Sequence, residues 1–138
     1  MEIKMKEYTE CAREMLEFID KSPTCFQAVK NIGDMLSAAG LAELREADEW
    51  KFERGKGYFV TRNESSVIAF RIPEQLSGFH IAAAHSDSPS FKVKESPEST
   101  VEEHYVRLNT EKYGGMILST WLDRALSVAG RIAVNGEK

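Results

Sequence analysis

The residues best suited to chemistry in this chain follow an apolar run at residues 79–84. The five residues that come directly after it are His85-Ser86-Asp87-Ser88-Pro89. Neutral imidazole is the commonest metal ligand in proteins. In extended backbone, side chains two residues apart lie on the same side, so Asp87 can accept the other ring N–H of His85 or approach a bound metal. The spacing is therefore compatible with a metal site.

Other interpretations of these residues remain open. A His-x-Asp pair is short and common, and it equally fits a histidine that is hydrogen-bonded within a turn. Ser86 and Ser88 could act as nucleophiles, but no Gly-x-Ser-x-Gly elbow surrounds them, which favours a role in capping the turn. An odd separation along a strand places side chains on opposite faces, so we expect His80 to be a core or interface histidine. We expect His104, which follows two glutamates, to be exposed.

The segments before this site predict two helices and a sheet. Apolar residues recur at three- and four-residue steps over residues 7–20 and again over residues 26–39. Ser22 is expected to cap the second helix, and Gly40 can supply its left-handed end. Two helices with apolar stripes need a partner surface, and a sheet is the natural one.

Strands are expected from residue 57 onwards. Residues 57–62 and 66–72 are rich in aromatic and β-branched residues and predict a hairpin. Residues 79–84 predict a strand that is buried on both faces. The polar residues 95–103 predict a loop or a crossing between domains. Further short strands are expected at residues 91–94, 104–109, 117–122 and 126–134.

Composition excludes several classes of protein. The 138 residues are 42% hydrophobic and 29% charged with a net charge of -4, which is typical of a globular domain. No basic stripe indicates nucleic-acid binding, and Lys92 and Lys94 are expected to form a solvated face. No apolar run could span a bilayer and the start has no signal-peptide core, so we expect a cytoplasmic protein without membrane contact. Cys11 and Cys25 are then expected to be small buried hydrophobes.

Five colinear parts of the chain resemble the M18 family of metalloaminopeptidases, which includes the aspartyl aminopeptidases. Each part is modest alone, but together they extend over residues 22–132. The matching segments are SPTCFQAV at 22–29; YF, RN and IAF at 58–59, 62–63 and 68–70; HSDSP and FKVK at 85–89 and 91–94; LN and YGG at 108–109 and 113–115; and STWLDR, LS and AGR at 119–124, 126–127 and 129–131.

This resemblance implies an α/β fold. Residues 1–95 would be the N-terminal part of a mixed-sheet α/β/α metallopeptidase sandwich, and residues 96–138 the start of an inserted β-rich assembly domain. The resemblance further implies peptide substrates, in many members with N-terminal Asp or Glu, two divalent ions such as zinc in the complete enzyme, and homo-oligomers that are typically dodecamers. On this template His85 is a metal ligand, and Asp87 is a catalytic residue that supports it or polarises the site.

The chain departs from the family pattern in sequence and in length. Ala125 stands where the family has an aspartate, and Leu122 where it has a phenylalanine. Asp123 beside Arg124 is expected to form a structural ion pair rather than a metal site. The other family ligands and the general base would lie beyond residue 138, whereas a catalytic metal needs about three protein ligands. We therefore expect the chain alone to be inactive, and poorly soluble or molten because its sheet would stay open.

Two further interpretations compete with an aminopeptidase that removes acidic, or else neutral, N-terminal residues. One is a non-catalytic, truncated paralogue that acts as an assembly module. The other is a fragment of a longer gene. The coding sequence downstream of Lys138 separates them. A longer frame with a carboxylate-rich region and a late histidine supports the enzyme, whereas a stop codon with independent expression supports the assembly module.

Overall fold

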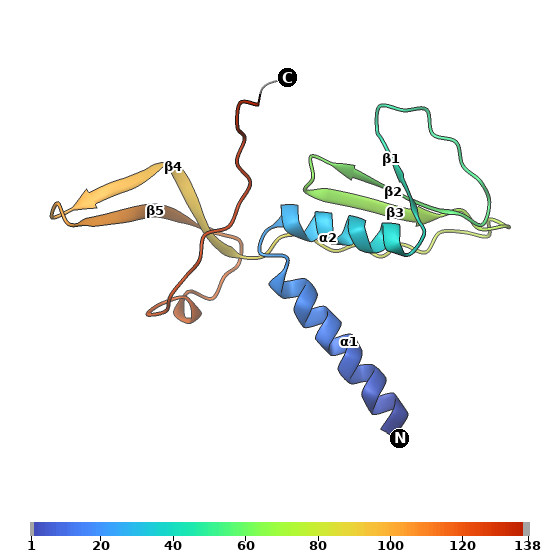
Figure 1. The fold of residues 1–138 in the computed structure, drawn as a ribbon, viewed down its shortest axis with the longest axis horizontal. Coiled ribbons are helices and arrows are strands. Elements are labelled where there is room, and N and C mark those ends of the chain that lie inside the picture. The colour runs from blue at the N-terminus through green and yellow to red at the C-terminus, as the bar shows by residue number, and fades with distance from the viewer. Residues whose placement is uncertain (1, 137–138) are drawn as a thin grey trace. The chain divides into compact units, whose positions relative to one another are not determined.

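The chain forms two compact units. The computed structural model describes residues 2–136, without the side chains of residues 2–6. The first unit runs to Asp87 and resumes at Ala129, and the second unit is Ser88–Val128. The elements in chain order are α1 (Glu2–Asp20), α2 (Cys25–Ala38), β1 (Ala42–Leu44), β2 (Gly57–Arg62), β3 (Ser66–Arg71), β4 (Ser90–Val101), β5 (Tyr105–Tyr113) and a short 3-10 helix, Leu118–Thr120 (Figure 1). The predicted division into a catalytic part, residues 1–95, and an assembly part, residues 96–138, concerns function and stays a prediction.

The first unit is built on a mixed three-stranded sheet. Strand β1 pairs in parallel with β2, and β2 pairs in antiparallel with β3. The β2–β3 hairpin runs in register from Gly57 opposite Arg71 to Arg62 opposite Ser66. Its turn has Asn63 and Glu64 at φ of 51° and 55°, the left-handed conformation that tight hairpin turns require. The predicted hairpin and the predicted α/β fold class are confirmed.

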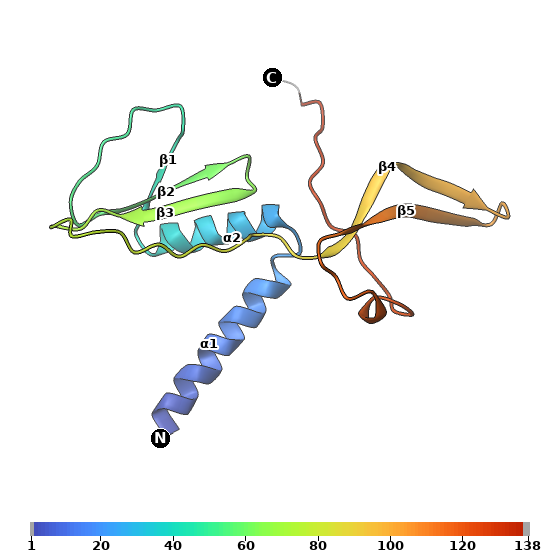
Figure 2. The same ribbon diagram turned by 180° about the vertical axis from the view of Figure 1, so that it is seen from behind.

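Helix α2 covers one face of this sheet (Figure 2). Its N-cap is Thr24, whose hydroxyl accepts a hydrogen bond from the Phe26 backbone N–H at 3.3 Å. The expected cap at Ser22 is wrong, because the Ser22 hydroxyl accepts instead from the Asn31 side-chain amide at 3.0 Å. Gly40 has φ of 81°, so the predicted left-handed helix end is confirmed.

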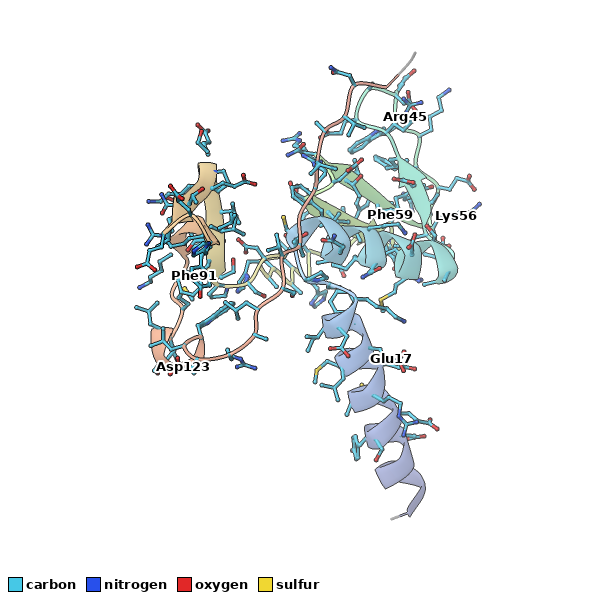
Figure 3. All side chains as sticks on the ribbon, turned by 60° about the vertical axis from the view of Figure 1, so that its left-hand side comes forward. Glu17, Arg45, Lys56, Phe59, Phe91 and Asp123 are labelled. Atoms are coloured by element: carbon cyan, nitrogen blue, oxygen red, sulfur yellow. The ribbon has the colours of Figure 1, made fainter. Side chains whose placement is uncertain are left out.

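The core of the first unit lies between α2 and β2. Phe59 is 2% exposed and Val29 is 1% exposed, and these are the largest fully buried side chains described. Figure 3 labels Phe59 beside α2. A Cβ on Gly33 would lie 3.5 Å from the Phe59 ring, an ordinary van der Waals distance, so this part of α2 lies close to the ring. On the opposite face, Phe52 packs edge-on against Tyr58 and Phe70 at 5.4 Å and 5.5 Å between ring centroids. The loop that carries Phe52 therefore covers the second face of β2.

Helix α1 was predicted and is present, but its apolar stripe is exposed. Tyr8, Met15, Leu16 and Ile19 each expose more than half of their surface. Among the described residues no element covers them. The periodicity therefore predicted the helix correctly, but it did not predict whether the apolar stripe is buried. Cys11 is also exposed and Cys25 is half-buried, so the expectation of buried cysteines is wrong. No helix of the described residues is long and apolar enough to cross a membrane.

Residues 79–84 do not form the predicted buried strand. No ladder pairing involves them, and Phe79 and Ile81 are 84% and 86% exposed. A strand that is buried on both faces needs neighbours on both edges and both faces, and the described part of the chain supplies none. His80 is exposed as well, so of its two predicted roles the core position is wrong, whereas the interface position stays a prediction.

The second unit is a β4–β5 hairpin with a bulge. The register shifts between Val93 and Glu98, and Pro97 lies in the unpaired stretch where a missing N–H breaks no ladder bond. The predicted strand at residues 91–94 is confirmed but continues to Val101, so the loop predicted at 95–103 is wrong over 95–101. His104, Lys92 and Lys94 are exposed as expected. The ring centroid of Phe91 lies 5.5 Å from that of Trp121, which anchors the segment after β5.

Three expectations near the C-terminal end of the chain are wrong. Residues 117–122 hold the 3-10 helix and a turn, and residues 126–134 form no strand within the described part. The Arg124 guanidinium donates to the Thr120 carbonyl oxygen at 3.1 Å. No ion pair joins Arg124 to Asp123 among the described residues, since the backbone carbonyl takes the arginine instead.

Candidate functional site

The site expected from the sequence contains a histidine whose ring is oriented by an aspartate. His85 Nδ1 lies 2.7 Å from the backbone carbonyl oxygen of Asp87 and 3.2 Å from Asp87 Oδ1. Both oxygens accept, and a carboxylate cannot donate, so Nδ1 carries the proton in this arrangement. The lone pair of a neutral ring then lies on Nε2, the atom that a metal would bind. The structure thus brings together the two residues that the sequence singled out.

The His85 side chain is accessible. It is 78% exposed and the Asp87 side chain is 38% exposed. An open imidazole held from one side by a carboxylate is the usual state of a metal-ligating histidine. The short contact of Nδ1 with the carbonyl oxygen two residues later also agrees with the other interpretation, a histidine hydrogen-bonded within a turn, so the metal role stays a prediction.

Ser86 connects this site to the β2–β3 turn. Its hydroxyl donates a hydrogen bond to the Ser65 carbonyl oxygen at 2.9 Å. The expectation that Ser86 caps its own turn is therefore wrong, because its partner lies 21 residues earlier in the chain. Sequence spacing carries no signal for such a bond.

Arg131 holds the same turn and was not expected from its position in the sequence. Its guanidinium donates from Nη1 to the Asn63 carbonyl oxygen at 3.0 Å and from Nη2 to Asn63 Oδ1 at 3.3 Å. Nη1 also lies 3.3 Å from Glu64 Oε2, and Cζ lies 4.1 Å from the centroid of the Phe26 ring. The only possible hint was its place in the AGR segment at residues 129–131, which gives no partner.

Two ion pairs with shifted pKa values lie near the start and the end of β2, and their role is structural. The Arg62 guanidinium donates to the Glu46 carboxylate, with Nε 2.8 Å from Oε1, which lowers the pKa of Glu46 and raises that of Arg62. Lys56 Nζ lies 3.1 Å from Glu53 Oε2, and this hydrogen-bonded pairing raises the pKa of Lys56. Both pairs belong to the loop between β1 and β2 and its attachment to β2.

The described residues fit one ligand of a metal site rather than a complete site. No group of three or more His, Cys, Asp or Glu side chains that could hold a metal is found within the part of the chain that the structure describes. His85 has the orientation and accessibility of a ligand, whereas a catalytic zinc needs about three protein ligands. A groove of about 480 Å³ lies elsewhere in the first unit, against α2, β2 and Arg131, and His85 does not line it.

Comparison with known proteins decides the family. The family described as "Aminopeptidase I zinc metalloprotease (M18)" matches residues 18–138. The chain belongs to the M18 family. The resemblance drawn from the five sequence segments is thereby confirmed.

Curated M18 relatives are longer than this chain. It is 48% identical over 136 residues to a probable M18 family aminopeptidase 2 of Clostridium novyi, which covers 96% of this chain and 31% of the relative. It is 43% identical over 134 residues to the aspartyl aminopeptidase of Dictyostelium discoideum, with 94% of this chain and 27% of the relative covered. The M18 chain thus spans under a third of the length of these relatives.

Solved structures confirm the fold. A chain of the cryo-EM structure of the Ape4 and Nbr1 complex matches with a TM-score of 0.79 and 40% identity, covering 84% of this M18 chain and 23% of that chain. The S. cerevisiae mApe1 dodecamer matches with a TM-score of 0.69 and 26% identity, covering 86% and 28%. The α/β architecture described here is therefore that of the corresponding part of M18 aminopeptidases.

Proposed function

We propose that this M18 chain contributes His85 as a ligand to the zinc site of an aminopeptidase, with Asp87 as the catalytic residue beside it. The observation that carries this is the pairing of His85 Nδ1 with the carbonyl and carboxylate oxygens of Asp87, which directs the Nε2 lone pair outward. Zinc is proposed as the metal because the chain belongs to a family of zinc metalloproteases. Neither residue is needed for the packing of the first unit, since neither is buried.

The two side chains have separate tasks in this function. Zinc, when bound, lowers the pKa of a coordinated water and polarises the peptide carbonyl. Asp87 keeps the proton on Nδ1, so that His85 stays in the tautomer whose Nε2 can bind metal. Ser86 holds the backbone between them against the hairpin turn.

The substrates are proposed to be peptides, from which the complete enzyme removes acidic or else neutral N-terminal residues. Support for the acidic preference comes from the name of the Dictyostelium relative, an aspartyl aminopeptidase. Support for a homo-oligomer, a dodecamer in the complete protein, comes from the mApe1 dodecamer. The number of metal ions, two, and the cytoplasmic location stay predictions from the sequence.

The 138-residue chain alone is proposed to be inactive. His85 and Asp87 are two of the groups that a zinc peptidase needs, and the described residues hold no cluster of three ligands. A single imidazole binds zinc too weakly to keep it in place during turnover.

The test compares variants in the full-length protein that contains this chain. H85A and D87N are purified with bound zinc measured by elemental analysis, and hydrolysis of aspartyl and leucyl p-nitroanilides is followed. H85A should lose zinc and activity, and D87N should lose most activity. H80A is the matched control, since His80 is an exposed histidine on the same segment. Zinc content that survives H85A would remove His85 from the site.

A second candidate, the non-catalytic assembly module, is favoured by one observation. Large apolar side chains are exposed on α1 and over residues 79–84. Exposed apolar surface of this kind often marks a site that binds another protein. The 138-residue chain should then form a defined oligomer by light scattering, whereas a zinc-free monomer or an irregular aggregate would argue against this role.

A further inference from the structure

The turn between β2 and β3 has two partners from distant parts of the chain. Ser65 O accepts from Ser86 Oγ at 2.9 Å, and Asn63 O accepts from Arg131 Nη1 at 3.0 Å. The two contacts lie on residues that are two positions apart. The turn therefore connects Ser86, the residue after His85, to the segment that begins at Ala129, 44 residues after His85.

Arg131 is engaged more completely than an ordinary surface arginine. Its two terminal nitrogens reach both oxygens of Asn63, and Nη1 also reaches the Glu64 carboxylate. The guanidinium lies over the Phe26 ring in the first turn of α2. A planar fork with several donors and a stacked face holds a backbone turn in one position better than a single contact does.

The conformation of this turn is one that outside contacts can fix. Asn63 and Glu64 have positive φ values, a conformation that non-glycine residues hold only when their surroundings fix it. Arg131 binds both of these residues. Loss of Arg131 would let the turn relax, and the Ser65 carbonyl that binds Ser86 would move with it.

We propose that Arg131 is a positioning residue for His85, acting through the Asn63–Ser65 turn and the Ser65–Ser86 hydrogen bond. Arg131 does not contact His85. It fixes the acceptor to which Ser86 is bound. Ser86 in turn fixes the backbone between His85 and Asp87, the residue that orients the imidazole. The role of His85 as a zinc ligand is itself proposed, so the two ideas need separate tests.

The experiment measures zinc affinity of the full-length protein by competition with a chelator. R131M should weaken zinc binding about ten-fold, the lower end of the loss seen when a group that orients a metal ligand is removed. Activity of R131M should return at saturating zinc. R131K keeps the charge but not the planar fork and should lose nearly as much. If R131M does not fold, as judged by its circular dichroism, R131K carries the test.

Two further variants show whether the effect passes through the turn. R54M is the matched control, because Arg54 is an exposed arginine that also donates to a loop carbonyl, that of Glu74 at 2.7 Å, and it should leave zinc affinity unchanged. S86A should weaken zinc binding, and R131M/S86A should be no weaker than the more damaging single variant, since both changes break one connection.

The outcomes separate the two ideas. Zinc affinity unchanged in H85A overturns the role of His85. Affinity lost in H85A but unchanged in R131M and R131K overturns the positioning role alone. Independent, multiplying effects of R131M and S86A also overturn it, because Arg131 would then act by another route.

Discussion

Strand β2 and residues 79–84 are both six-residue segments rich in apolar side chains, and their surroundings are opposite. Strand β2 has a neighbouring strand on each edge. Helix α2 covers one of its faces and the loop that carries Phe52 covers the other, and residues 57–60 are buried. Residues 79–84 have no strand beside them in the described part of the chain, and all of them are exposed. Apolar composition therefore marks a segment that can be buried, whereas the neighbours decide whether it becomes a strand.

The sharpest way to break this comparison is to truncate one phenylalanine in each run. F59A in the 138-residue chain should lower the free energy of unfolding by about 3–5 kcal/mol, because it empties the space between α2 and β2. F79A should change it by less than about 0.5 kcal/mol, because Phe79 is 84% exposed. Urea denaturation followed by circular dichroism measures both.

Two results would change this picture. An equal cost for F79A would mean that residues 79–84 are covered, by another copy of the chain or by a refolded segment. A parent chain without a cooperative urea transition would support the molten state expected from the sequence.

A smaller effect is expected from weakening the helix that covers β2. T24A removes the hydroxyl that caps α2 and should lower the free energy of unfolding by about 1 kcal/mol. T24S keeps a capping oxygen and should stay close to the parent chain. Urea midpoints of the two variants decide this, and equal midpoints would show that the cap adds nothing to the burial of Phe59.

The smallest effect concerns the loop on the other face of β2. The pKa of Glu46 is lowered in the folded chain because Arg62 donates to its carboxylate. A lowered folded pKa means that the pair stabilises fully above the unfolded pKa of Glu46 and loses this contribution as the pH falls through the folded value. Thermal melts of E46Q and the parent chain should therefore differ slightly at neutral pH and converge in acid. A difference that grows in acid would contradict the sign.

The elements that the sequence predicted correctly depend on local patterns. Helix α2 and the β2–β3 hairpin follow from periodicity and from the turn residues Asn63 and Glu64, which lie within a few positions of their partners. The pairing of His85 with Asp87 also follows from a two-residue spacing. In these cases the interacting groups are close along the chain, so the sequence itself places them.

The failures have a common physical cause, which is dependence on distant partners. Burial of α1 and of residues 79–84 needs surfaces that residue patterns cannot specify. The extension of β4 through Pro97 depends on a bulge that frees this position from the ladder. The contacts of Ser86 and Arg131 with the hairpin turn join residues 21 and 68 positions apart, and no periodic signal links them.

The two tryptophans of the chain are divided between its compact units. Trp50 packs edge-on against Phe52 and donates from Nε1 to the Arg45 carbonyl oxygen in the first unit, and Trp121 packs against Phe91 in the second. Tryptophan fluorescence, excited where tyrosine absorbs little, consequently contains one emitter for each unit. With W121F the tryptophan emission reports on the first unit, and with W50F it reports on the second unit, so the order in which the units melt can be recorded without any label.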